Sequence, residues 1–242
     1  MRKVAIFAEG QSEQIFVRYF LGQTISWGRL SFKCVKLNAN RMMDVPFDYE
    51  AADAQVYFLI VNVGNDEAVL SAIKDREKGL LGKGYEKIIA LRDMYSENYC
   101  KRSPKVIDDS ITNLFIDSWH STIQSMSDPD KIKMRVAIME LEAWFLGMYG
   151  IFERINPTLS VDYIERRLGF NLTKIDPQIE FFKPTDEVDK ILQLIGSGYR
   201  KTKDVVESIC SKMKLTDFYN AVENGRCRSF RDFCEEMLNY RQ

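Results

Sequence analysis

The stretch Val4-Ala5-Ile6-Phe7-Ala8-Glu9-Gly10-Gln11-Ser12-Glu13 decides the fold of this chain. Its apolar run with β-branched members, closed by Gly10, predicts a buried parallel strand followed by a sharp turn. Ser12 is expected to cap a helix. The apolar positions of that helix recur at helical spacing: Ile15, Phe16, Tyr19 and Phe20. Glu9 and Glu13 then lie at the carboxyl end of a strand, where open α/β sheets bind ligands.

Two interpretations of these glutamates stay open. Acidic residues in a first helical turn complement the helix dipole, which would explain Glu13 without any function. Glu9 directly follows a hydrophobic strand, so its carboxylate is expected to be nearly buried. Burial of a charge is costly unless a metal or another cation compensates it. This segment alone favours neither interpretation.

Length and composition restrict the class of protein. With 242 residues, 45% of them hydrophobic, the chain is one large domain or one domain with a smaller addition. A net charge of −1 argues against a general polyanion binder, so nucleic acid would be bound by local patches. The apolar run that ends at Glu9 is too short for a signal peptide, and no later run has membrane-spanning length. Five cysteines without a CxxC pair predict a reduced cytoplasmic protein without a disulfide frame or a zinc cluster.

Strand and helix patterns alternate in the first part of the chain and become purely helical near residue 150. Further strands are predicted at 30–37, 56–63, 87–91 and 133–139, and loops at 38–53 and 96–106. Helices are predicted at 67–81, 108–126, 160–168, 185–195, 202–213 and 230–240. This order predicts an α/β fold with a mostly parallel sheet flanked by helices. We expect a metal-binding domain at 1–150 and a helical C-terminal extension at 151–242, either separate or packed on the same domain.

Carboxylates follow three of the predicted strands. They are Glu9, Glu13, Asp93, Glu140 and Glu142. Oxygen ligands without His or Cys suit Mg²⁺ or Mn²⁺ rather than zinc. Because clustered like charges repel, such a site needs cations at neutral pH. The chemistry expected of it is phosphoryl transfer or phosphodiester hydrolysis, in which the metal activates water and stabilises the leaving oxygen.

Several motifs at these positions resemble a known fold. EGQSE at 9–13 after a strand, the acidic strand end at Asp93 and the later Glu140-x-Glu142 together look like a Toprim (topoisomerase–primase) domain. In its relatives among the overcoming-lysogenisation-defect nucleases, the two glutamates of the first motif and the later acidic pairs bind metal. More narrowly, EGQSE, LRD at 91–93, ELEAWFL at 140–146 and a trailing KP…YRK segment at 183–201 resemble a family of uncharacterised bacterial Toprim-like proteins.

The resemblance implies a Mg²⁺-dependent nuclease acting on DNA or RNA, encoded beside an ATPase partner and serving phage defence. It implies that Glu9 and Asp93 are catalytic. The metal ligands implied are Glu9, Glu13, Asp93, Glu140 and Glu142.

One position departs from the Toprim pattern. An Asp-x-Asp pair is expected at the second site, whereas this chain has Asp93-Met94-Tyr95. Glu97 could substitute from the loop, a second metal could bind weakly, or the site could be degenerate. The rival hypothesis is therefore a non-catalytic Toprim scaffold that docks to an ATPase.

Other side chains have both a structural and a functional interpretation. Tyr199, Arg200, Lys201 and Lys203 follow a Gly-Ser-Gly turn that is expected to expose them. Such a basic cluster is either a solvated face or a phosphate contact, with Lys201 and Lys203 as the candidates for supplying transition-state charge. Trp144 and Phe145 are expected to anchor a helix in the core. His120 is interpreted as a packing or surface residue.

Overall fold

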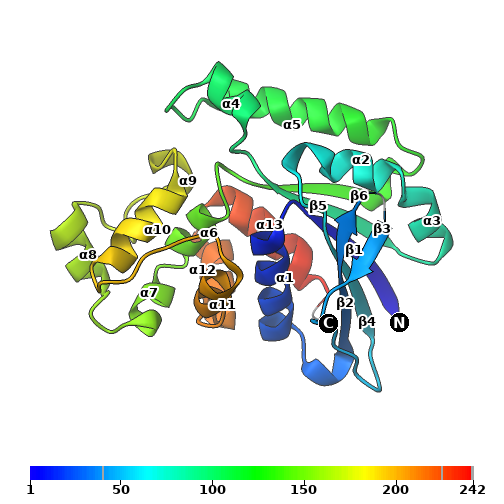
Figure 1. The fold of residues 1–242 in the computed structure, drawn as a ribbon, viewed down its shortest axis with the longest axis horizontal. Helices are drawn as coiled ribbons and strands as arrows, with labels where there is room; N and C mark the ends of the chain where they lie inside the picture. Colours follow the sequence, from blue (N-terminus) through cyan, green and yellow to red (C-terminus); the bar gives the residue numbers. More distant parts are fainter. Residues whose placement is uncertain (40, 225, 241–242) are drawn as a thin grey trace. The chain divides into compact units, whose positions relative to one another are not determined.

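The computed structural model describes residues 1–39, 41–224 and 226–240. Within that part of the chain a six-stranded sheet has the strand order β3-β2-β4-β1-β5-β6 (Figure 1). The strands are β1 (Arg2–Ala8), β2 (Leu30–Asn38), β3 (Arg41–Asp44), β4 (Val56–Asn62), β5 (Lys87–Asp93) and β6 (Ile132–Ala137). The predicted α/β class and the mostly parallel sheet are confirmed.

The chain divides into two compact units. The first comprises Met1–Arg92, Asp108–Val136 and Tyr240–Gln242, and the second Asp93–Ile107 and Ala137–Asn239. Helices of the first unit are α1 (Gln11–Thr24), α2 (Val69–Lys74), α3 (Glu77–Gly82) and α5 (Asp109–Gln124). Those of the second are α4 (Glu97–Arg102), α6 (Glu142–Gly147), α7 (Gly150–Ile155), α8 (Val161–Leu168), α9 (Pro177–Glu180), α10 (Pro184–Gln193), α11 (Lys203–Cys210), α12 (Leu215–Asn224) and α13 (Arg228–Leu238).

The first strand forms the centre of the first unit. Residues 4–8 of β1 are completely buried. They pair in parallel with β4 on one side and β5 on the other, so that Ala8 is in register with both Asn62 and Leu91. A strand that is covered on both faces has a continuous run of apolar residues, and for this reason the sequence predicted a buried strand here.

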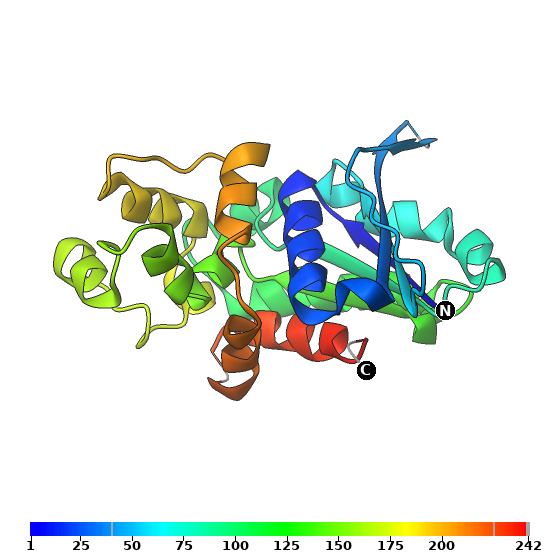
Figure 2. The same ribbon diagram turned by 90° about the horizontal axis from the view of Figure 1, so that it is seen from below.

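The connections that flank β1 run in opposite directions. From β1 the chain passes through α1 to β2, which lies on the far side of β4 in the sheet. From β4 it passes through α2 and α3 to β5, which lies on the far side of β1. Right-handed crossovers in opposite directions place their helices on opposite faces of the sheet, as Figure 2 shows for α1 and α3. The carboxyl ends of β1 and β4 are therefore a topological switch point. Gln14 of α1 holds that helix in place by donating from Nε2 to the carbonyls of Val35 and Ile60, both at 2.9 Å.

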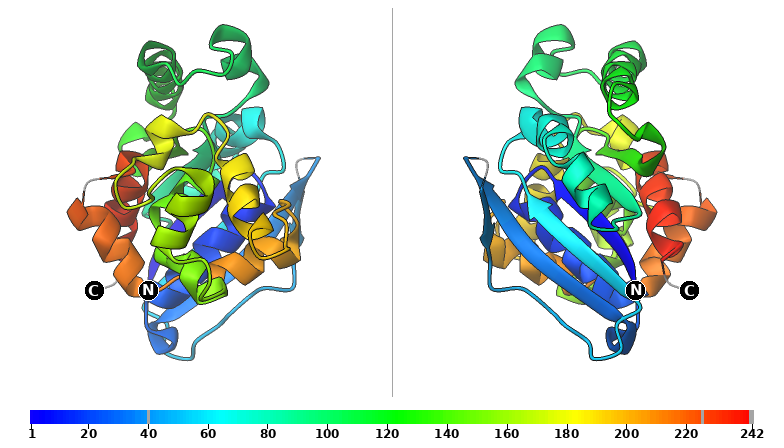
Figure 3. Two further views of the ribbon diagram at one scale, coloured as in Figure 1. Left: turned by 90° about the vertical axis from the view of Figure 1, so that its left-hand side faces the viewer. Right: turned by 90° about the vertical axis from the view of Figure 1, so that its right-hand side faces the viewer.

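Two details at the start of the chain and in the predicted 38–53 loop differ from expectation. Gly10, not Ser12, is the N-cap of α1, and its N–H donates to the carboxylate of Glu13 at 2.9 Å. The predicted loop contains β3, which pairs antiparallel with β2 at the edge of the sheet (Figure 3, right). Its four residues are exposed and lack apolar alternation, so no strand signal was present. Residue 40 of this loop lies outside the described residues.

The helix predicted at 67–81 is interrupted. A 3₁₀ turn at Asp66–Ala68 precedes α2, and α3 begins only at Glu77. The guanidinium of Arg76 donates to the carbonyl of Ala72 at 3.1 Å, while the N–H of Arg76 donates to Ile73. A continuous α-helix would join the Arg76 N–H to the Ala72 carbonyl. The side chain of Arg76 therefore takes the acceptor that the helix would have used.

The second unit is built on helices, with no strand after β6 in the described residues. Trp144 and Phe145 of α6 are completely buried, which confirms their role as core anchors. The indole of Trp144 stacks on Phe230 with ring centroids 5.1 Å apart, and its N–H donates to Ser229 Oγ at 2.9 Å. The predicted 96–106 loop contains α4, capped by Ser96. Across the described residues, no helix combines the length and apolar character that crossing a membrane requires.

Candidate functional site

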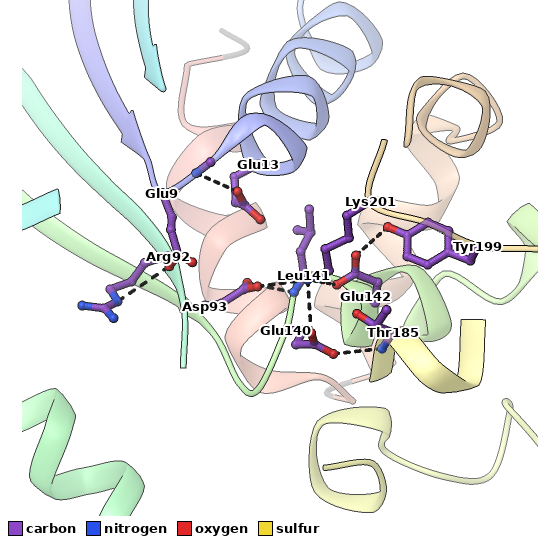
Figure 4. Close-up of polar contacts among 11 residues, drawn as sticks. Glu9, Glu13, Arg92, Asp93, Glu140, Leu141, Glu142, Thr185, Tyr199 and Lys201 are labelled. Carbon is purple, nitrogen blue, oxygen red and sulfur yellow. Dashed lines mark hydrogen bonds and ion pairs between the residues drawn. The ribbon is translucent and has the colours of Figure 1, made fainter. Parts of the chain in front are cut away.

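Three of the predicted acidic residues come together in the second unit (Figure 4). Asp93 is the last residue of β5, Glu140 follows β6 after a short turn, and Glu142 is the first residue of α6. Met139 makes that turn with a φ of 60°, a left-handed conformation that non-glycine residues seldom adopt. Asp93, Glu140 and Glu142 are 5%, 8% and 0% exposed. We call these three residues the acidic trio.

The ammonium group of Lys201 lies among the acidic trio. Its Nζ is 3.0 Å from Glu142 Oε2, 3.2 Å from Glu140 Oε1 and 3.6 Å from Asp93 Oδ2. The expectation that the Gly-Ser-Gly turn exposes this loop is wrong for Tyr199, which is buried, but Arg200 and Lys201 are exposed. The Lys201 side chain is 35% exposed although its ammonium group contacts the trio. Buried carboxylates need a compensating cation, and Lys201 supplies it from the same chain.

Each carboxylate of the trio is fixed by a second donor. The N–H of Leu141 donates to Asp93 Oδ1 at 2.9 Å, and the N–H of Thr185 donates to Glu140 Oε2 at 2.9 Å. The hydroxyl of Tyr199 donates to Glu142 Oε1. In every case one oxygen is held by a neutral donor and the other is the one nearest Lys201 (Figure 4). The orientation of the three carboxylates is therefore set by the protein around one cation position.

The charge state of Lys201 follows from its surroundings. Burial alone lowers the pKa of the ammonium, because it disfavours the charged form. The negative charges of Glu142, Asp93 and Glu140 outweigh burial and raise the pKa of Lys201 well above its ordinary value. Lys201 is consequently a permanent cation at neutral pH.

Tyr95 occupies the position where the Toprim pattern has its second aspartate. Its ring packs edge-on against Phe182 with centroids 5.7 Å apart, and Lys183 Nζ lies 5.9 Å from the Tyr95 ring centroid. Burial raises the pKa of Tyr95, so the phenol is neutral at physiological pH. Glu97, the suggested substitute, is exposed and forms an ion pair with Lys101 at 2.6 Å. Neither side chain joins the contacts around Lys201 that the structure describes.

Glu9 lies in the first unit and has a cation of its own. Its N–H donates to the carbonyl of Leu91 at 2.9 Å, which extends the pairing of β1 with β5 by one residue. Its carboxylate is 20% exposed, and Oε2 lies 4.0 Å from Nε of Arg92. The guanidinium of Arg92 in turn lies over the ring of Trp119, 4.4 Å from the centroid. Arg92 thus provides the compensating charge that the position of Glu9 requires.

Glu13 is explained by its capping role. Its carboxylate accepts from the N–H of Gly10, and it is 5% exposed in the first turn of α1. This is the structural interpretation considered from sequence, in which a first-turn acid stabilises the start of the helix. That Glu9 and Glu13 bind metal together with the acidic trio stays a prediction. Lys203 begins α11, and its catalytic role also stays a prediction.

The acidic trio has the right type of ligand atom for Mg²⁺ or Mn²⁺, but in this structure the oxygens are too far apart to bind either ion. Three carboxylates and the hydroxyl of Thr185, whose Oγ1 is buried without a hydrogen-bond partner among the described residues, are hard oxygen donors. In the described part of the chain, however, no three His, Cys, Asp or Glu side chains are arranged to hold a metal between them. Oxygens that surround an ammonium at 3.0–3.6 Å are too far apart for Mg²⁺, whose ligands lie at about 2.0–2.1 Å. Metal binding here requires Lys201 to move and the carboxylates to close in.

Sequence reasoning missed two of the groups that orient the trio. Thr185 could have been found, since Lys183-Pro184 marks a helix start, where N–H groups lack helical partners and bind anions. Tyr199 carried no such signal, because nothing in the sequence pairs residue 199 with residue 142.

Comparison with protein-family models, with curated proteins and with solved structures found no match for this chain. The fold and the described contacts define an α/β protein with a buried acidic trio that is neutralised by Lys201 of the same chain.

Proposed function

We propose that this chain is a Mg²⁺- or Mn²⁺-dependent nuclease that hydrolyses phosphodiester bonds in DNA or RNA. One observation supports the proposal above the others. Asp93, Glu140 and Glu142 are each fixed by a separate donor, and each presents its remaining oxygen to a single cation position. Groups held in place before the reaction are the usual means by which proteins stabilise developing charge.

The residues of the chain have distinct parts in this proposal. The acidic trio would hold the metal, which supplies Lewis acidity and an activated water at the phosphate. Leu141, Thr185 and Tyr199 keep the carboxylates oriented through the hydrogen bonds described above. Lys201 neutralises the trio before metal binds and would then contact negative charge on the phosphate.

The biological setting is proposed on the sequence resemblance alone. The EGQSE, LRD and ELEAWFL motifs are the basis for proposing a Toprim-like fold, an ATPase partner and a role in phage defence. The fold is compatible with this assignment because the parallel strands deliver Glu9 and Asp93 at their carboxyl ends.

A second candidate function is a non-catalytic module that docks to an ATPase. The observation that favours it is the ion pairing of Lys201, which balances the trio without any metal. Tyr95 favours it as well, because a neutral phenol packed on Phe182 replaces a second carboxylate.

Measurements of nucleic-acid cleavage and of metal binding distinguish the nuclease from the docking module. Purified protein would be incubated with single- and double-stranded DNA, RNA and tRNA in Mg²⁺ or Mn²⁺, with and without the neighbouring ATPase. Glu142→Gln keeps the shape of the side chain and removes its charge, whereas Glu97→Gln is the matched control at an exposed side chain. The nuclease proposal expects cleavage and Mn²⁺ binding by titration calorimetry that are lost only in Glu142→Gln. Wild-type protein that binds no Mn²⁺ and cleaves nothing under all these conditions would decide for the docking module.

A further inference from the structure

Two aromatic side chains and a lysine lie beside the acidic trio in the second unit. Tyr95 and Phe182 are each partly exposed, and their rings pack edge-on with centroids 5.7 Å apart. The ring of Phe182 also meets the buried ring of Tyr99 at a centroid distance of 6.5 Å, which anchors the pair on the core. We call Tyr95, Phe182 and Lys183 the aromatic rim.

Backbone hydrogen bonds hold the aromatic rim next to Glu140. The N–H of Tyr95 donates at 2.7 Å to the carbonyl of Met139, the residue directly before Glu140. On the other segment of the rim, Lys183 lies two residues before Thr185, whose N–H donates to Glu140 Oε2 at 2.9 Å. Both segments of the rim are therefore attached to the same part of the acidic trio.

Lys183 supplies positive charge to the rim. It is exposed, it is the N-cap residue of α10, and its Nζ lies 5.9 Å from the centroid of the Tyr95 ring. Among the described residues Lys183 forms no ion pair, whereas Lys190 of α10 is paired with Glu187 at 2.7 Å. The charge of Lys183 is thus open to an anionic group that approaches the two rings.

Partly exposed rings beside an ammonium group without an ion pair are suited to a nucleotide that is not base-paired. Aromatic side chains stack on the face of a base, and lysines contact the phosphates of the strand. Inside a duplex the faces of each base are covered by the neighbouring bases, so aromatic side chains stack on bases of single strands and loops instead.

We infer that the aromatic rim binds one unpaired nucleotide of a nucleic-acid strand, with its base against Tyr95 and Phe182 and a phosphate at Lys183. This inference rests on the proposed function and narrows its substrate class from nucleic acid in general to segments without base pairs. A nucleotide held at the rim brings the adjoining phosphodiester bond toward the acidic trio, because the rim is attached next to Glu140.

Fluorescence anisotropy in EDTA tests the rim with the full chain, because binding is then measured without metal-dependent cleavage. The probes are a single strand of DNA and one of RNA, each compared with its own duplex, and a DNA strand of equal length made of abasic nucleotides. Wild type should bind at least one of the single strands about tenfold more tightly than its duplex. It should also bind the DNA strand about tenfold more tightly than the abasic strand.

Matched variants assign this binding to the rim. Phe182→Leu should weaken single-strand binding about fivefold or more and leave the abasic strand unaffected. Phe181→Leu is the control and should bind like wild type, because Phe181 is also partly exposed and loses an equivalent edge-on contact, with Phe170 at 5.0 Å. Lys183→Met should reduce the slope of log affinity against log salt concentration by about 0.7, whereas Lys190→Met should leave it unchanged.

The outcomes separate this inference from the nuclease proposal. The inference is overturned if wild type binds no strand, if it binds single strands, duplexes and the abasic strand alike, or if Phe182→Leu binds as tightly as Phe181→Leu. Cleavage confined to duplexes would overturn it too, while the nuclease proposal stands. Binding in the expected pattern without any cleavage in Mn²⁺ would support the rim as a nucleotide site and contradict the nuclease.

Discussion

Lys201 Nζ lies 3.0 Å from Oε2 of Glu142, a side chain with no exposure to solvent, and Tyr199 donates to the other oxygen of the same carboxylate. A buried carboxylate held from both sides has no freedom to find another partner. The ammonium is consequently a structural requirement of the protein without metal, whatever its part in a reaction.

Removal of the ammonium should make the protein depend on a divalent cation. Lys201→Met leaves three carboxylates facing one another, and we expect a loss of about 1–3 kcal/mol in the free energy of unfolding, since Lys201 is partly exposed. A metal that takes the vacated position binds only the native state and restores stability. The shift of Tm on addition of Mn²⁺ should therefore be larger in Lys201→Met than in wild type, as measured by differential scanning fluorimetry.

Lys203→Met is the control for that experiment, because it removes a lysine at the start of α11 two residues further on. It should leave the Mn²⁺-dependent shift of Tm at the wild-type value. Equal shifts in wild type and Lys201→Met would mean that the metal does not compete with this ammonium.

The raised pKa of Lys201 predicts how stability changes at alkaline pH. In the unfolded chain a lysine titrates near pH 10.4, whereas in the folded protein it keeps its proton to higher pH. Its contribution is thus complete below about pH 10.4 and is lost as pH rises toward the folded-state pKa, by at most about 1.4 kcal/mol per pH unit. Urea unfolding of wild type and Lys201→Met should show a stability difference that is constant to about pH 10 and then shrinks. A difference that grows above pH 10 contradicts the assignment.

The hydrogen bond between Tyr199 and Glu142 should be measurable by a double-mutant cycle. Tyr199→Phe leaves Oε1 of a completely buried carboxylate without its donor and should cost about 1–3 kcal/mol of unfolding free energy. In a Glu142→Gln background the cost should be smaller, because a neutral amide is cheaper to leave unpaired. Tyr163→Phe on α8 serves as the control, with an effect within about 0.5 kcal/mol. Additive losses in the cycle would show that the two side chains do not interact.

The parts of the fold that could be predicted are those whose signal is local. Residues 4–8 and 56–61 are continuous apolar runs because both faces of their strands are covered, so strand type and parallel pairing followed from the sequence. β3 has four exposed residues, and its pairing with β2 depends on the neighbouring strand rather than on its own composition. At the break between α2 and α3 the guanidinium of Arg76 donates to the carbonyl of Ala72, a contact that no propensity scale includes.

The candidate site also has residues that could be predicted from the sequence and contacts that could not. Asp93, Glu140 and Glu142 were found because strand ends are a positional rule, and the structure brings these three together. The partners of Lys201 could not be predicted, since pairings between residues so distant in the sequence leave no periodic pattern. The Gly-Ser-Gly turn suggested exposure, which holds for Arg200 and Lys201, whereas the ring of Tyr199 is buried and its hydroxyl donates to Glu142.

The last prediction concerns Tyr95, where a carboxylate is missing from the expected pattern. Tyr95→Asp gives up an edge-on contact with Phe182, worth about 0.5–1.5 kcal/mol, and adds a negative charge two residues after Asp93. In the nuclease proposal this charge should raise the affinity for Mn²⁺ and the rate of cleavage, measured by calorimetry and on labelled DNA and RNA. Tyr95→Asn is the matched control, because it loses the same ring without adding charge.

Lys183 decides how that experiment is interpreted. Lys183 Nζ lies 5.9 Å from the centroid of the Tyr95 ring, so a carboxylate at position 95 would be partly neutralised by this ammonium group. Lys183→Met combined with Tyr95→Asp should therefore bind Mn²⁺ more tightly than Tyr95→Asp alone. If Tyr95→Asp and Tyr95→Asn behave alike in both backgrounds, a second carboxylate here does not contribute to metal binding. Loss of ATPase binding in both variants, without any gain in cleavage, would instead assign Tyr95 and Phe182 to a docking surface.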